Sequence, residues 1–184
     1  MAYELDTVKV LVVESSTPLF QLFQGVLRLL GVPEINVFPA YSKQEGFEKF
    51  VRGNHDLLII DWMGVPDQGI QLVREIRTNP RSPNPFVPIL MTAGSGHERR
   101  VFLSRDNGVS DYLVKPFSAK DLASRIERLI EKPRPFVHFT DEEGNLGYVG
   151  PDRRLKEKPF EGYDRRMVMS PTTSAAQQRQ QQQN

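Results

Sequence analysis

The chain has no cysteine among its 184 residues. This absence excludes disulfide bonds, cysteine-ligated zinc, iron–sulfur clusters and thiol catalysis. The start of the sequence lacks a basic segment followed by an apolar one, so no signal peptide is visible. No apolar run approaches the roughly 18 residues that a membrane span requires. We therefore expect a cytoplasmic protein with no membrane span.

An excess of positive charge is also lacking. Lysine and arginine number 24 and aspartate and glutamate 23, which gives a formal net charge of +1. Residues 1–132 carry 16 basic and 16 acidic side chains, and residues 133–184 carry 8 and 7. Because nucleic-acid binding normally needs a clear basic excess, we expect no nucleic-acid partner.

Two kinds of apolar pattern alternate in the first 132 residues. Runs of strand length lie at residues 8–13, 35–40, 56–60, 87–91 and 111–114. Segments with helical spacing of apolar residues lie at residues 17–30, 42–51, 69–77, 97–105 and 118–131. Such alternation predicts an α/β fold, with a five-stranded parallel sheet wound doubly by helices as a (βα)5 unit. Ligands of this architecture bind at the carboxyl ends of the strands.

The composition changes after Lys132. Residues 133–166 are rich in proline, glycine and charge, and the segment YVGPDRR (148–154) is echoed by FEGYDRR (160–166). We treat them as an extension with two Asp-Arg-Arg repeats, which either bind an acidic surface of a partner or form a solvated tail. Residues 167–184 are of low complexity and end in a glutamine-rich stretch, which predicts a largely disordered C-terminal tail.

Four polar residues stand at the ends of four predicted strands. Glu14 follows the first strand, Asp61 ends the third, Thr92 the fourth and Lys115 the fifth. Two carboxylates at one sheet edge suggest a Mg²⁺ site, since this ion is held by one or two carboxylates together with water and phosphate oxygens. Each residue taken singly is more simply explained as a cap or a structural contact. Their convergence at one edge is the functional signal.

Three segments resemble a known family in their order and spacing. They are DLLIIDWMGVPDQGIQLVREIR, PILMTAG and DYLVKPFSAKDL, and together with the first strand they resemble the receiver domain of two-component response regulators, close to the chemotaxis regulators. The resemblance covers residues 7–132. It implies a flavodoxin-like receiver fold for this part of the chain.

The resemblance also implies roles for individual residues. Asp61 would accept a phosphoryl group from a histidine kinase or a phosphotransfer protein, with Lys115 and Thr92 as the other catalytic residues. Thr92 and Tyr112 would form the switch. Glu14, Asp61 and the main-chain carbonyl of Met63 would hold Mg²⁺.

One departure from the family concerns the metal. Receivers usually carry two adjacent acidic residues after the first strand, whereas this chain has Glu14 followed by Ser15. Ser15 supplies no charge, so we expect Mg²⁺ binding to be weak. The receiver is atypical in this acidic pair.

Three functions are compatible with these patterns to different degrees. The first is a single-domain response regulator in a phosphorelay, which signals by protein–protein contact and is not an enzyme in the usual sense. The second is a phosphorylation-independent scaffold that acts through its surface and its C-terminal tail. The third, a phosphatase-type hydrolase, is disfavoured because the acid–base position two residues after Asp61 is occupied by Met63.

Overall fold

The structure is a computed structural model, and it describes residues 5–64, 67–140, 146–153 and 166–169. No helix within these ranges is both long and apolar enough to cross a membrane. The second Asp-Arg-Arg repeat, apart from Arg166, and residues 170–184 of the predicted tail lie outside the described residues.

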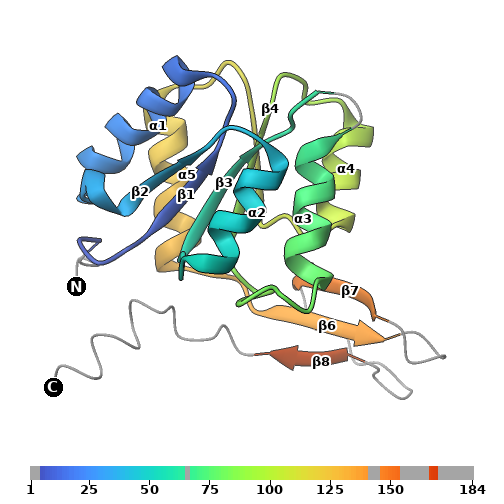
Figure 1. Cartoon of the computed structure of the whole chain (residues 1–184). Coiled ribbons are helices and arrows are strands. Elements are labelled where there is room, and N and C mark those ends of the chain that lie inside the picture. Colours follow the sequence, from blue (N-terminus) through green and yellow to red (C-terminus); the bar gives the residue numbers. More distant parts are fainter. Residues whose placement is uncertain (1–4, 65–66, 141–145, 154–165, 170–184) are drawn as a thin grey trace, which may run out of the picture.

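A five-stranded parallel sheet forms the centre of the molecule (Figure 1). The strand order is β2-β1-β3-β4-β5. The strands are β1 (Val10–Val13), β2 (Val37–Ala40), β3 (Leu57–Asp61), β4 (Ile89–Ala93) and β5 (Asp111–Val114). Strands β1 and β4 are buried at every position, as expected of parallel strands that are covered on both faces. The predicted fold class is confirmed.

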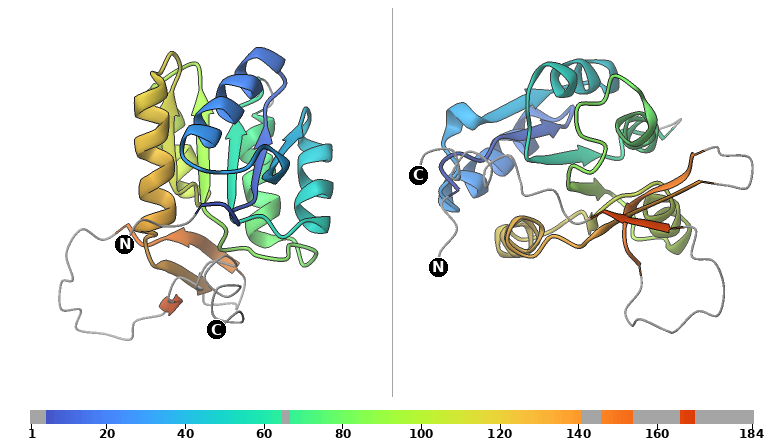
Figure 2. Two further views of the ribbon diagram at one scale, coloured as in Figure 1. Left: turned by 90° about the vertical axis from the view of Figure 1, so that its left-hand side faces the viewer. Right: turned by 90° about the horizontal axis from the view of Figure 1, so that it is seen from below.

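Helices cover both faces of this sheet (Figures 1 and 2). They are α1 (Thr17–Leu29), α2 (Lys43–Arg52), α3 (Gln68–Thr78), α4 (Glu98–Asp106) and α5 (Ala119–Glu131), with a short 3-10 helix η1 (Glu34–Asn36) before β2. Helices α1 and α5 pack in one core cluster, and α2 and α3 pack in the other. All five helices and all five strands of the sheet match predicted segments, and no end differs by more than two residues.

Serine residues begin two of the helices as the sequence suggests. Ser118 and Asp121 form a complete capping box at the start of α5. Ser42 accepts a hydrogen bond from the Glu45 amide at the start of α2, but the Glu45 carboxylate accepts from the Tyr41 amide and not from Ser42. Only half of a capping box is therefore present at the start of α2.

A second, antiparallel sheet follows α5, and the sequence patterns did not indicate it. Its strands are β6 (Phe136–Thr140), β7 (Leu146–Pro151) and β8 (Arg166–Met169), in the order β7-β6-β8. Residues 167–169 of β8 belong to the segment that was predicted to be disordered. The sheet lies beyond the amino ends of the parallel strands (Figure 1). These short strands bury the apolar residues Phe136, Val137 and Val149, and this burial favours packing of the second sheet against the receiver.

Candidate functional site

The sheet register brings the four strand-end residues to one edge. Asp61 pairs in register with Thr92, on neighbouring strands. Glu14 directly follows β1 and Lys115 directly follows β5. We call this end of the sheet the carboxyl edge and the opposite end the amino edge. The convergence predicted from the sequence is confirmed by these positions.

Lys115 bridges two carboxylates at the carboxyl edge. Its Nζ donates to Glu14 Oε2 and to Asp61 Oδ1, each at 2.7 Å. The Glu14 side chain is almost fully buried, whereas Asp61 and Lys115 remain partly open to solvent. Burial lowers the pKa of Lys115, but the hydrogen bonds and charges of Asp61 and Glu14 outweigh it and raise the pKa above its usual value. Lys115 is therefore a firmly protonated cation beside Asp61.

Two main-chain amides fix the carboxylates from the other side. The Met63 amide donates to Asp61 Oδ2 at 2.8 Å, and the Ser16 amide donates to Glu14 Oε1 at 2.9 Å. Met63 and Gly64 both have positive φ, at 52° and 59°, so the chain turns sharply after Asp61. This turn aims the Met63 amide back at the carboxylate.

Thr92 lies on β4, the strand next to Asp61, and Tyr112 lies on β5, one strand further along the sheet. The Thr92 hydroxyl is fully buried, and its Oγ1 is 3.5 Å from Asp61 Oδ1, the outer limit of a hydrogen bond. Tyr112 donates its hydroxyl to the Ser95 carbonyl at 2.6 Å, in the segment that joins β4 to α4. Burial raises the pKa of the Tyr112 hydroxyl. The charge of Arg100 lowers it and the charge of Asp61 raises it, and the pKa stays above its usual value. The two side chains thus connect Asp61 to the loop before α4.

The residues at this edge fit a single divalent cation, but they supply few side-chain ligands for it. Glu14 and Asp61 already place one oxygen each within 2.7 Å of a common cation, the Lys115 ammonium. Ser15 is exposed and adds no charge. In the part of the chain that the structure describes, no group of three or more metal-ligating side chains occurs. Such an ion would therefore rely on two carboxylates, main-chain oxygen and water.

Two neighbours of Asp61 contribute more to this edge than the sequence patterns indicated. Trp62 is buried and donates its indole N–H to Asp67 Oδ1 at 2.7 Å. Arg100, on α4, lies with its guanidinium 4.9 Å from the centre of the Trp62 ring, a cation–π contact. The sequence patterns could not reveal this contact, because two residues 38 positions apart leave no local pattern.

The part of the chain that carries this edge is similar to known proteins. Residues 10–127, more than half of the chain, match the family described as the response regulator receiver domain. The chain is 29% identical over 124 residues to the chemotaxis protein CheY of Pseudomonas aeruginosa, a match that covers 67% of this chain and 97% of that protein.

Regulatory proteins with longer chains also match. The phosphate regulon transcriptional regulatory protein PhoB of Rhizobium meliloti is 37% identical over 85 residues, covering 46% of this chain and 37% of that protein. The PhoB protein of Pseudomonas aeruginosa is 25% identical, covering 68% of this chain and 53% of that protein. The chain therefore spans between about a third and a half of the length of these relatives.

Solved structures share the same architecture. A response regulator from Thermotoga maritima superposes with a TM-score of 0.59 at 25% identity, covering 68% of this chain and 99% of that chain. A putative response regulator from Chloroflexus aurantiacus superposes with a TM-score of 0.60 at 26% identity, covering 68% and 98%. The second sheet lies outside the family match, because that match ends at residue 127.

Proposed function

Because this chain belongs to the receiver domain family of two-component response regulators, we propose that it accepts a phosphoryl group on Asp61. The donor would be the phosphohistidine of a histidine kinase or of a phosphotransfer protein. The observation that carries the proposal is the Lys115 ammonium at 2.7 Å from both Asp61 and Glu14. It is a fixed positive charge beside a partly exposed nucleophile.

The chemistry assigned to these residues is mainly positioning and charge neutralisation. An Asp61 carboxylate oxygen attacks the phosphorus atom, the bond from phosphorus to the donor imidazole breaks, and an acyl phosphate forms. Lys115 keeps contact with the new phosphoryl oxygens, and Thr92 donates its hydroxyl to one of them. Glu14, Asp61 and the Met63 carbonyl would hold Mg²⁺, which neutralises phosphoryl charge when bound.

The signal would travel through Thr92 and Tyr112. Thr92 starts at the limit of hydrogen-bond distance from Asp61, so a phosphoryl group gives its hydroxyl a closer partner. Tyr112 already bonds the loop that Thr92 would pull, through Ser95. Phosphorylation would then shift an existing equilibrium between two arrangements of this loop and α4.

We assign the output to protein–protein contact in the cytoplasm, by a chain that acts as a single-domain regulator. Residues 7–132 would form the receiver, and residues 133–166 an extension that carries the Asp-Arg-Arg repeats. A signalling module of this kind exchanges a phosphoryl group without turning over a metabolite, and we assign it no nucleic-acid partner.

A second candidate is a scaffold that works without phosphorylation. Ser15 favours it, because the exposed hydroxyl replaces an acidic residue expected to hold the metal. The intact group of Asp61, Thr92 and Lys115 opposes it, since a scaffold has no need for a lysine shared between two carboxylates.

Trp62 offers a direct test of the two candidates. Its ring lies beside Asp61 in sequence and under Arg100 in space, so its fluorescence reports on this edge. We expect a saturable change with Mg²⁺ and a further change with beryllofluoride, which mimics a phosphoryl group. The Asp61→Asn variant should lose the beryllofluoride response. Incubation with acetyl phosphate should add one phosphoryl mass to the wild type and none to the variant.

Absence of both responses in a folded protein would contradict phosphorylation and support the scaffold. The far-ultraviolet circular dichroism of wild type and Asp61→Asn must match, so that loss of fold is not mistaken for loss of the site.

A further inference from the structure

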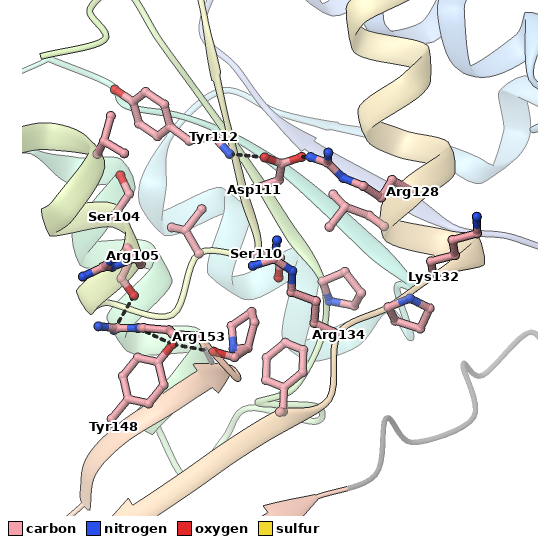
Figure 3. A pocket seen from close by; sticks show the side chains of 17 residues that line it. Ser104, Arg105, Ser110, Asp111, Tyr112, Arg128, Lys132, Arg134, Tyr148 and Arg153 are labelled. Atoms are coloured by element: carbon pink, nitrogen blue, oxygen red, sulfur yellow. Dashed lines mark hydrogen bonds and ion pairs between the residues drawn. The ribbon is translucent and has the colours of Figure 1, made fainter. Parts of the chain in front are cut away.

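A cavity of about 450 Å³ lies between the receiver and the second sheet (Figure 3). Its walls come from α4, the start of β5, the end of α5, the segment that joins α5 to β6, and the end of β7. The volume is in the range of small-molecule sites. The carboxyl-edge residues Glu14, Asp61, Thr92 and Lys115 do not line it, so the cavity is separate from the proposed phosphorylation site.

The cavity is lined by far more positive than negative charge. The basic lining residues are Arg105, Arg128, Lys132, Arg134 and Arg153, and the one acidic lining residue is Asp111. Asp111 is already paired with Arg128 and, at 2.5 Å, with Arg125. Lys132 and Arg134 make no ion pair with any residue in the described ranges. Arg105 and Arg153 pair with Asp106, which does not line the cavity, so Lys132 and Arg134 are the lining cations that the cavity offers to a bound anion.

The remaining walls are apolar and aromatic. Val101, Val109, Leu129 and Phe136 contribute apolar surface, and the ring of Tyr148 stands beside Arg153 (Figure 3). A bare inorganic anion would leave this surface unused, and an apolar molecule would strip water from the cations without pairing them. The lining matches a ligand that joins a flat ring to a multiply charged anionic group.

The wall formed by β7 is held firmly in place. Arg153 donates to Asp106 and to the Arg105 carbonyl, both at 2.7 Å, and lies 4.3 Å from the centre of the Tyr148 ring. Tyr148 in turn donates to the Pro151 carbonyl at 3.1 Å. The first repeat, YVGPDRR, thus fastens the hairpin of β6 and β7 to the end of α4. A site whose wall is fixed in advance loses little entropy when it binds.

We propose that this cavity binds a free nucleotide, with the phosphates on Lys132 and Arg134 and the base against the apolar wall. Guanidinium groups suit this ligand because they pair with phosphate oxygens and stack on flat rings. The extension after α5 is then part of a second ligand site, formed jointly with the receiver.

Isothermal titration of the full chain with ATP and GTP tests the proposal at fixed ionic strength. We expect saturable binding of at least one nucleotide, with a dissociation constant below about 100 μM. The double variant Lys132→Ala/Arg134→Ala should bind at least about tenfold more weakly, because it removes two charge-assisted contacts. Arg99→Ala is the matched control, since Arg99 is exposed on α4 outside the cavity, and its affinity should stay unchanged. Asp61→Asn should bind normally, which separates this site from the phosphorylation site.

Two further probes identify the part of the ligand that is recognised. Pyrophosphate should bind more weakly than either nucleotide, because it cannot use the apolar wall. A short single-stranded oligonucleotide should bind no better than a mononucleotide. The proposal is overturned if no nucleotide saturates, if pyrophosphate or the oligonucleotide binds as tightly as ATP and GTP, or if the double variant keeps full affinity.

Discussion

The two edges of the parallel sheet each hold a partly or fully buried cation, but they hold it differently. At the carboxyl edge, Lys115 is shared between two carboxylates and stays 19% exposed. At the amino edge, Arg77 is 3% exposed and, among the described residues, donates to the main-chain carbonyls of Gly108 and Pro85, while its guanidinium lies 5.1 Å from the centre of the Phe136 ring. Lys115 can exchange a carboxylate for an incoming anion, whereas Arg77 is held by main-chain carbonyls that the fold keeps in place. The ion pairs of the carboxyl edge can therefore rearrange when an anion binds, whereas the contacts of Arg77 at the amino edge stabilise the fold.

Arg77 should therefore produce the largest loss of stability when it is removed. Arg77→Ala leaves the Gly108 and Pro85 carbonyls without their donors and opens a cavity beside Phe136. We expect unfolding free energy to fall by about 3–5 kcal/mol, measured by urea denaturation. The second sheet should also lose the contact between Phe136 and Arg77 that holds it against the receiver.

A neighbour on the same helix provides the control. Arg74 is exposed and bonds the Asn107 side chain, so Arg74→Ala should change the unfolding free energy by no more than about 0.5 kcal/mol. Equal effects of the two substitutions would show that burial of Arg77 is not what fastens this edge.

The next effect depends on pH and comes from His55, which precedes β3 at the amino edge. It is buried against Phe38 and Phe50, and burial, with a smaller contribution from the charge of Lys9, lowers its pKa from 6.5 to about 4. The folded state favours neutral His55, so below 6.5 the unfolded state binds the extra proton first. The contribution of neutral His55 to the unfolding free energy should be fully present above pH 6.5. It should fall by about 2–3 kcal/mol as the pH drops to about 4.

Urea denaturation across this pH range measures the effect. His55→Phe keeps an aromatic ring between Phe38 and Phe50 and removes the titrating group, so its pH slope should be smaller by that amount. An unchanged slope would assign the pH dependence to other groups.

The two edges also differ in how far the sequence could predict them. The carboxyl edge was predictable because parallel topology carries every strand end to the same side, so Glu14, Asp61, Thr92 and Lys115 could be placed together from their positions in the chain alone. The distances and the shared position of Lys115 could not, since they depend on rotamers and loop turns.

The amino edge was largely hidden from sequence reasoning. Its strands β6 and β7 are short, and their apolar residues are few among prolines and glycines. Arg77 sits in a helix as an ordinary polar position, and only the tertiary contacts with Gly108 and Phe136 show that it is buried. The first Asp-Arg-Arg repeat was visible as a repeat, but its role at the end of α4 depends on contacts 47 and 48 positions away.

Gly108 tests how closely the second sheet must approach the receiver. Its φ is 84°, and a Cβ there would lie 2.2 Å from the Val149 carbonyl oxygen. Gly108→Ala should cost about 2–3 kcal/mol, because both strain and main-chain displacement follow. Gly25→Ala is the opposite case, since it lies in α1 with nothing within 4 Å, and it should stabilise the protein by up to about 1 kcal/mol. Thermal denaturation distinguishes the expected loss of stability in Gly108→Ala from the expected gain in Gly25→Ala. If Gly108→Ala leaves the stability unchanged, the hairpin can move away from the receiver without cost.

The smallest expected effect returns to the carboxyl edge and to Ser15, which follows Glu14. Ser15→Asp adds a second acidic residue beside Glu14, so Mg²⁺ affinity should rise about tenfold, which is about 1.4 kcal/mol. Titration of Trp62 fluorescence with Mg²⁺ measures this change. Thr17→Asp is the matched control, because it adds the same charge on the exposed first turn of α1, and it should shift the affinity less than about twofold.

The same pair of variants also decides what the serine does. If Ser15→Asp binds Mg²⁺ no better than the wild type, the metal does not depend on this position, and Glu14 and Asp61 suffice with main-chain oxygen. If both aspartate variants raise the affinity equally, the gain is a general effect of charge at this edge. Only a gain confined to Ser15→Asp shows that a carboxylate at this position reaches the metal, and that Ser15 keeps Mg²⁺ binding at the carboxyl edge weak.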